Sequence, residues 1–369
     1  MTILLFIAVL VVLIVVHELG HFLVAKKFGI RVDEFGIGFP PKIVGKKYGE
    51  TEYTLNWLPI GGFVRIWGED PTEEHLRGPG SDKSFVNKSR PIQAAVLVAG
   101  VAMNVLLAFV LFVGAFMYGM PVEVDESDTL HAEQASLLIS SVMPDSPAAE
   151  ALKPSDTILS VHSGDVLIPS DDTPLHPSVV ASFISGSGGE QVTFEVLRRG
   201  EPMTVVVTPV FGVIPDQPER AAAGFTMSLV TTERLPFHRA VVVAGERTYQ
   251  TLIAIVVGIS GLLAEAVRGT ADFSQVAGPV GIVGLVGDAA ALGFSWLLIF
   301  TAFISLNLAI INLLPIPALD GGRLLFVLIE SITRKPIPMI VATRMNQVGF
   351  IFLLTLMALV TINDVSRFF

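Results

Sequence analysis

The chain has 369 residues, an apolar fraction of 51% and a formal net charge of −10. The acidic balance argues against nucleic acid as a partner, and the absence of cysteine excludes disulfides and thiolate metal sites. The apolar residues gather into long runs, which is typical of a protein embedded in a lipid bilayer. Any bound metal must therefore be held by His, Asp or Glu side chains.

The first predicted element is an apolar helix from about Thr2 to Val24, long enough to cross a bilayer. Its apolar run is too long for a signal peptide, no basic segment precedes it, and it contains His17, Glu18 and His21. A leader that is cleaved off has no use for such residues. We therefore expect this segment to be retained as a membrane span.

The segment His17-Glu18-Leu19-Gly20-His21 has the H-E-x-x-H form. Histidines four residues apart project from one face of a helix and can hold a zinc ion together, and Glu18 is then placed to act as general base on the zinc-bound water. The alternative is a set of helix polar residues packed by chance. Two imidazoles and a carboxylate are costly inside an apolar span, which favours the functional interpretation.

Gly61-Gly62 follows this span, between apolar runs that contain aromatic residues, and predicts a turn or bulge of a β-hairpin. An exposed edge strand near the zinc could bind an unwound substrate segment by β-addition, whereas a purely structural hairpin is an equally good interpretation. The second span is expected from Ile92 to Met120. Within it, Asn104 could hydrogen-bond the substrate backbone or tie helices together, and the latter is the safer interpretation.

The acidic stretch that follows contains alternating apolar runs between about Ala135 and Val210. Within it, Asp145 to Glu150 predicts a helix start. The segment from Ser140 to Gly164 resembles the PDZ modules of bacterial proteases, with Ser155-Asp156 in place of the usual Gly-Asp. No carboxylate-binding Gly-Leu-Gly-Phe loop is visible, which argues against binding of a free C-terminus. Exclusion of substrates with bulky outer domains and simple substrate docking are both open as roles.

Residues Thr251 to Val267 are apolar but interrupted by Glu265, so we interpret them as an interfacial or packed amphipathic helix, with the embedded alternative left open. Two further spans are expected, from Phe294 to Leu314 and from Val348 to Ile362. Lys and Arg are concentrated in residues 24–90 and are sparse in residues 121–234, so the first loop is expected in the cytoplasm and the acidic segment outside. Four crossings then leave both termini extracytoplasmic.

The sequence from Asn312 to Gly322, NLLPIPALDGG, supplies a third metal ligand in Asp320. Its prolines break the helix, and irregular backbone at membrane depth is tolerated only where it faces protein or a water-filled cavity. Gly321 and Gly322 are expected to permit close approach to the other helix. An ordinary helix-capping role for Asp320 is the alternative. Asn312, like Asn104, could bind substrate backbone or tie helices.

Taken together, these motifs resemble the site-2 protease family, and within it the bacterial enzymes that cleave membrane-bound anti-sigma factors. His17 to His21 fits the family's zinc motif, and Asn312 to Gly321 fits its N-x-x-P-x-P-x-L-D-G motif, whose aspartate is the third zinc ligand. Weaker similarities to family landmarks lie in the hairpin and in three further segments, which are Gly100 to Asn104, Gly278 to Gly281, and Asn363 to Arg367. The resemblance covers nearly the whole chain.

The resemblance implies one Zn²⁺ per chain and hydrolysis of single-pass membrane proteins, namely anti-sigma factors or remnant signal peptides, at the bacterial cytoplasmic membrane. The expected fold is membrane α-helical, with four transmembrane helices and a membrane-associated β-hairpin, plus one extracytoplasmic PDZ-like α/β domain. The expected divisions are 1–120, 125–212, 235–293 and 294–369. A metal-binding transporter or receptor and a PDZ scaffold are rival functions. The first does not need a base beside its ligands, and the second leaves the HELGH motif unexplained.

Overall fold

The computed structural model describes residues 2–69, 72–124, 135–164, 166–170, 173–198, 200–214, 217–269 and 278–366. Arg367, at the end of one expected landmark, and residues 125–134 of the expected outer domain lie outside these ranges. The chain forms two compact units. One comprises Met1–Gly114, Phe237–Ala290 and Trp296–Phe369, and the other comprises Ala115–Pro236 and Ala291–Ser295. The second unit extends beyond the expected limits of 125 and 212.

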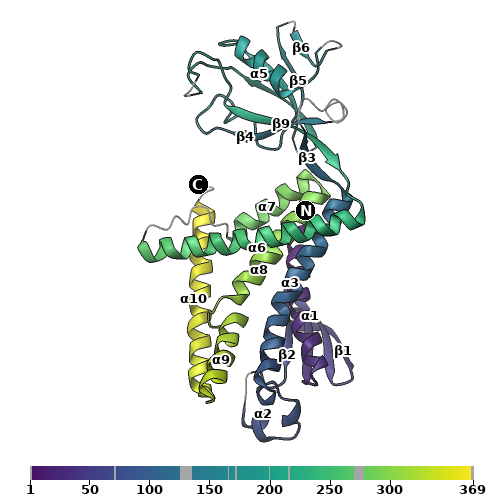
Figure 1. Ribbon diagram of the computed structural model, residues 1–369, viewed down its shortest axis with the longest axis vertical. Helices are drawn as coiled ribbons and strands as arrows, with labels where there is room; N and C mark the ends of the chain where they lie inside the picture. The colour runs from purple at the N-terminus through teal and green to yellow at the C-terminus, as the bar shows by residue number, and fades with distance from the viewer. Residues whose placement is uncertain are drawn as a thin grey trace. The chain divides into compact units, whose positions relative to one another are not determined.

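The first unit is mainly helical. Its helices are α1 (Thr2–Lys27), α2 (Glu73–Arg77), α3 (Arg90–Tyr118, which ends in the second unit), α6 (Phe237–Arg268), α7 (Pro279–Leu292), α8 (Phe294–Leu313), α9 (Asp320–Thr333) and α10 (Met339–Ser366), with short 3₁₀ turns at Ser81–Lys83 and Phe85–Asn87. Five described helices, α1, α3, α6, α8 and α10, are long and apolar enough to cross a membrane by length and composition. Figure 1 shows that α6 runs across the direction of α3, α8 and α10.

Helix α6 is longer than the sequence indicated. It begins at Phe237, directly after Pro236, rather than near Thr251. Glu246, Arg247 and Gln250 lower the apolarity of its first half, but such residues are good helix formers and do not end a helix. The apolar stretch therefore marked only the second half of the helix. Helix α10 likewise extends beyond the expected Val348 to Ile362 at both ends.

The β-hairpin between α1 and α3 consists of β1 (Val32–Tyr48) and β2 (Thr51–Ile66). Residues 34–37 pair with 62–65 on one side and with 52–55 on the other, while 42–48 pair with 51–56. The chain reverses at Gly49, whose φ of 62° suits glycine. Gly61 and Gly62 instead lie where the two paired parts of β2 meet. The segment 62–66 therefore forms one edge of this small sheet.

The hairpin is fixed to the helices by an apolar cluster and by charge. Buried residues from α1, both strands, α3, α9 and the connecting segments pack together. They are Ala25, Ile30, Val32, Ile66, Phe85, Val96, Leu97 and Val327. At the hairpin turn, hydrogen bonds from Lys26 (2.8 Å) and Lys83 (3.2 Å) lower the pKa of the Glu50 carboxyl below its ordinary value. The cluster brings β2 and α9 to the same end of α1.

The second unit is an α/β domain. Its elements are β3 (Met120–Val124), β4 (Ser136–Val142), β5 (Thr157–Ser163), β6 (Val166–Ile168), α5 (Pro177–Gly186), β7 (Val192–Arg198), β8 (Glu201–Val207) and β9 (Phe225–Glu233). The strands form one sheet in the order β3-β9-β4-β5-β7-β8, with β6 beside β5. Because β9 pairs with both β3 and β4, residues beyond 212 belong to this domain.

Two details of this domain concern the predicted PDZ-like segment. Asp145 to Glu150 forms turns in place of the expected helix start, with Asp145 at a φ of 59°. Ser155 has a φ of 74°, a left-handed conformation that favours glycine. Asp156, next to it, is 1% exposed and accepts hydrogen bonds from Arg198 at 2.8 and 2.6 Å.

Candidate metal centre

Three side chains from two distant parts of the chain converge in the first unit. His17 and His21 lie one turn apart on the inner face of α1, and both are buried. Asp320 is the first residue of α9, and its Oδ2 atom lies 3.0 Å from Nε2 of His17 and 3.3 Å from Nε2 of His21. The two Nε2 atoms are 3.2 Å apart. The structure thus brings together the three predicted ligands.

The spacing of these three atoms fits a zinc ion. Ligand atoms bound at about 2.0–2.1 Å in a tetrahedron lie about 3.3 Å from one another, close to the separations found here. Asp320 Oδ2 is buried, has no hydrogen-bond partner elsewhere in the described part of the chain, and lies beside the Nε2 atoms of the two imidazoles. Two imidazoles and one carboxylate leave a fourth position open, as in catalytic zinc sites.

Asp320 does not cap its own helix. The N-cap of α9 is Leu319, and the helix start shows no side-chain cap hydrogen bond. The carboxylate instead points toward the histidines from the first turn of α9, where the helix dipole favours a negative charge. The helix-capping alternative considered from the sequence therefore does not describe the role of this side chain.

Both histidines are oriented by contacts with α3. The Nδ1 atom of His21 lies 2.8 Å from the carbonyl oxygen of Val96, so Nδ1–H donates there and leaves Nε2 for a metal. Asn104, fully buried, places its side-chain amide 3.3 Å from Nδ1 of His17, and its backbone carbonyl accepts a hydrogen bond from Ser305 of α8 at 2.8 Å. Asn104 thus contacts a ligand and helps connect α3 with α8.

The close fit of α3 on α1 depends on two glycines. A Cβ atom on Gly20 would collide with the carbonyl group of Ala99, and a Cβ on Gly100 would collide with the ring of His21. Gly100 therefore lets the backbone of α3 form the wall behind both imidazoles. The G-x-x-x-N spacing of Gly100 and Asn104 was visible in the sequence, but its relation to the histidines depends on how the helices pack.

Glu18 faces a different neighbour from the histidines. Its Oε2 atom accepts a hydrogen bond of 3.1 Å from the backbone N–H of Val64, in the edge segment of β2. Glu18 also lines a cavity of about 230 Å³ with His17 and Asp320, while Ile14, Leu308, Asn312, Ala318 and Leu319 complete the lining. A carboxylate beside the ligands and open to a cavity is suitably placed to exchange a proton with a bound water. The contact with Val64 has no sequence signal, because any residue supplies a backbone N–H.

The remaining predicted residues fall into two groups. Asn312 lies in the lining of the small cavity. Gly61 and Gly62 do not line this cavity. A Cβ atom on either glycine would lie within 4 Å of Ile14, which stands one turn before His17 on α1. The hairpin thus contacts α1 in two ways: Gly61 and Gly62 lie close to Ile14, and Val64 donates a hydrogen bond to Glu18.

Gly321 and Gly322 allow the first turn of α9 to lie close against the chain that precedes it. A Cβ atom on Gly321 would collide with the carbonyls of Leu313, at the end of α8, and of Leu314, and one on Gly322 with the carbonyl of Ile316. The closest neighbours of the two glycines are thus the end of α8 and the loop that follows it, which folds back tightly over the first turn of α9. Leu319 N–H donates to the carbonyl of Ile316 at 3.1 Å within the same loop. This compact loop fixes the position of Asp320.

Comparison with known proteins agrees with this arrangement of residues. Residues 5–356 match peptidase family M50. A candidate zinc metalloprotease of Clostridium perfringens is 36% identical over 358 residues, which cover 96% of this chain and 95% of the relative. One from Mesorhizobium japonicum is 32% identical, covering 97% of each chain, and zinc metalloprotease RasP of Geobacillus kaustophilus is 29% identical, covering 99% and 97%. The chain therefore belongs to peptidase family M50, the family of the site-2 proteases.

Proposed function

We propose that this protein is a zinc metalloendopeptidase that cleaves single-pass membrane proteins within or near the bilayer. The observation that carries the proposal is the convergence of His17, His21 and Asp320 with Glu18 in the adjoining cavity. The names of the M50 relatives, which specify zinc metalloproteases, support zinc as the metal. Zinc also suits two imidazoles and a carboxylate better than calcium or magnesium does.

The residues of the site divide the work of peptide hydrolysis. His17, His21 and Asp320 would hold one zinc ion, which supplies a Lewis acid that activates water when bound. Glu18 takes the proton of the attacking water on its carboxylate and passes it to the leaving amine. The hydrogen bond from Val64 keeps the Glu18 carboxylate turned toward the hairpin side of the cavity. Val96 and Asn104 hold the two rings.

The edge of the hairpin offers a place for the substrate. Segment 62–66 pairs with β1 on one side, and the N–H of Val64 points away from β1 toward Glu18. A substrate segment unwound from helix would satisfy its backbone polar groups along this edge, next to the base. Asn312 is placed to hydrogen-bond that segment from the cavity wall, while Gly61 and Gly62 keep the edge close to α1.

The substrate class, the topology and the role of the outer domain belong to the same proposal. The family resemblance favours anti-sigma factors and remnant signal peptides of the bacterial cytoplasmic membrane. Four crossings by α1, α3, α8 and α10, with both termini outside, agree with the charge distribution, and the crosswise course of α6 supports its interfacial placement. The outer domain, PDZ-like by its sequence, would either exclude untrimmed substrates or dock them.

The function is tested by cleavage of a model single-pass substrate in liposomes, with bound zinc recorded for each variant. Glu18→Gln keeps the shape of the side chain but removes the base, so cleavage should fall by about 10²–10⁴-fold while zinc stays bound. Glu123→Gln in β3 is the matched control and should cleave like the wild type. Cleavage by Glu18→Gln at the wild-type rate would refute the mechanism. Zinc binding without cleavage by any form would favour the rival metal transporter or receptor.

A further inference from the structure

The loop before Asp320 contains a residue in a costly conformation. Ala318 has a φ of 78°, in the left-handed region, which costs an L-residue such as alanine about 1–2 kcal/mol. Such a conformation persists only where its surroundings hold it. Asp320 lies two residues later, so any relaxation of Ala318 would move the carboxylate away from the histidines. The contacts that hold Ala318 therefore affect the metal centre.

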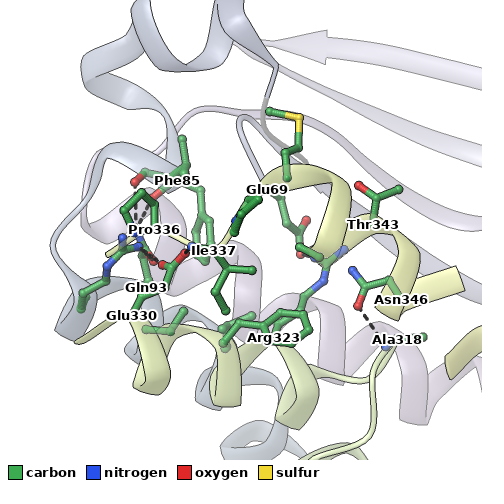
Figure 2. Close-up of a pocket in the computed structure, with 18 of the residues that line it drawn as sticks. Glu69, Phe85, Gln93, Ala318, Arg323, Glu330, Pro336, Ile337, Thr343 and Asn346 are labelled. Carbon is green, nitrogen blue, oxygen red and sulfur yellow. Dashed lines mark hydrogen bonds and ion pairs between the residues drawn. The ribbon is translucent and has the colours of Figure 1, made fainter. Parts of the chain in front are cut away.

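One of these contacts comes from α10. The side chain of Asn346 accepts a hydrogen bond from the backbone N–H of Ala318, with Oδ1 3.3 Å from the nitrogen. Figure 2 shows Asn346 directed at Ala318 from α10. Both residues line a cavity of about 1010 Å³, so the loop has open space beside it on this side. The hydrogen bond supplies a support that close packing does not give there.

The second contact lies one turn further along the same face of α10. Gly349 is buried, and a Cβ atom on it would stand 2.6 Å from the carbonyl carbon of Pro317 and collide with the carbonyl oxygen. Residues three apart share one face of a helix. Asn346 and Gly349 thus contact two consecutive residues of the loop, Ala318 and Pro317.

Few of the described residues of α10 are buried. Among its residues with described burial, only Gly349 and Asp364 are buried, while the large apolar side chains of the helix are mostly exposed. Asp364 lies at the opposite end of the helix, at the start of α7. The attachment of α10 near the metal centre is therefore concentrated at the Pro317–Ala318 loop.

We infer that Asn346 and Gly349 of α10 are positioning residues for Asp320, acting through the backbone of Pro317 and Ala318. The inference rests on the metal-binding role proposed above for Asp320. Neither residue touches the site where the metal would be held; both act by fixing the loop that carries its third ligand. Loss of either contact should weaken zinc binding without altering any ligand.

The test compares Asn346→Leu, Asn346→Asp and Gly349→Ala in the full-length protein. Gln347→Leu is the control for position 346, since Gln347 is adjacent on α10 and lines the same cavity, and Gly258→Ala, with open space around it on α6, is the control for position 349. Zinc affinity is measured by competition with a chelator. Amide exchange of residues 313–322 is measured in the metal-free protein, with exchange in α1 as the check that the fold is intact.

Asn346→Leu and Gly349→Ala should bind zinc about 10–100-fold more weakly, the usual effect of losing a residue that orients a ligand, and exchange in the loop should rise while α1 stays protected. Asn346→Asp keeps an acceptor oxygen in place and should behave like the wild type. Zinc affinity and loop exchange equal to those of the controls would overturn the inference, as would an Asn346→Asp variant as weak as Asn346→Leu. If the wild type bound no zinc, the proposed function would fail, while loop exchange would still test the positioning.

Discussion

Replacing Gly100 with alanine adds one methyl group directly behind the two histidines. The new Cβ would stand 2.7 Å from Cε1 of His17 and 2.8 Å from Cε1 of His21, and would collide with Nε2 of His21. Carbon atoms reach their favourable separation at about 3.5–4.0 Å, so each ring has to retreat by roughly 0.7 Å or more. The carbonyl of Val96, which holds His21, lies on the same helix as the added methyl group. The rings therefore move away from their orienting partners as well as from Asp320.

The size of the effect follows from the tolerance of a zinc site. Ligand distances in such sites stay within about 0.2 Å of their preferred values, well below the displacement required here. Loss of one orienting contact already costs about 10–100-fold in metal affinity. Because Gly100→Ala displaces two ligands together, we expect zinc affinity to fall by at least about 100-fold, which corresponds to about 2.7 kcal/mol. Cleavage should fall with it.

The matched control lies on the same helix. A Cβ on Gly114 would meet only Leu298 Cδ1, at 3.7 Å, which is an ordinary contact. Gly114→Ala should therefore bind zinc like the wild type and gain slightly in helix stability. Zinc affinity from chelator competition, thermal unfolding in detergent and substrate cleavage are recorded for both variants. Wild-type zinc affinity in Gly100→Ala would show that the metal is not held by His17 and His21 as the structure places them.

Two further predictions concern parts of the chain outside the metal centre. Ser155→Gly should stabilise the second unit by about 0.5–1 kcal/mol, because glycine adopts the left-handed conformation without strain. The midpoint of its unfolding, followed by hydrogen exchange, should rise, and a fall would contradict the reasoning. Asp364→Ala removes the carboxylate that accepts hydrogen bonds from Gly278 and Gly281 at 3.1 and 2.9 Å and should destabilise the helical unit by about 2 kcal/mol. Asp364→Asn should lower the thermal unfolding midpoint less than Asp364→Ala. An Asp364→Ala variant as stable as the wild type would show that these hydrogen bonds do not stabilise the start of α7.

The sequence predicted the metal ligands because their chemistry depends on residue type. Histidine and aspartate are rare inside apolar segments, and the i, i+4 spacing of His17 and His21 already defines one helix face. Asp320 could be added because its motif places an acidic residue directly after a proline-containing break in an apolar helix. The geometry that joins the three side chains then followed from the packing of α1 and α9, which the apolar pattern only outlines.

The contacts that orient the site could not be predicted in the same way. The carbonyl of Val96 and the N–H of Val64 are backbone groups, which every residue type supplies. Asn346 carries a side chain that is informative in principle, but its partner is the backbone of Ala318, in a loop whose left-handed residue is not a glycine. Such contacts depend on the path of the chain in space and leave little trace in a single sequence.

The boundaries of the helices and strands could not be predicted for a related reason. Apolarity marks the part of a helix that contacts lipid or protein, whereas backbone hydrogen bonding continues through polar residues with good helix propensity, as in the first half of α6. In the hairpin, the Gly61-Gly62 pair marked an irregular point of β2, but the reversal itself falls at Gly49. The composition of a long strand does not show which of its residues pair with which part of the neighbouring strand.

The close contact of Gly20 and Gly100 also determines which parts of the site can diverge. The wall behind the imidazoles is main chain, so there is no side chain at these two positions that could be exchanged to reshape it. The lining of the small cavity includes the side chains of Ile14 on α1 and of Leu308 and Asn312 on α8. Substitutions at these side chains can therefore change the shape of the cavity, whereas the main-chain wall behind the imidazoles offers no such position.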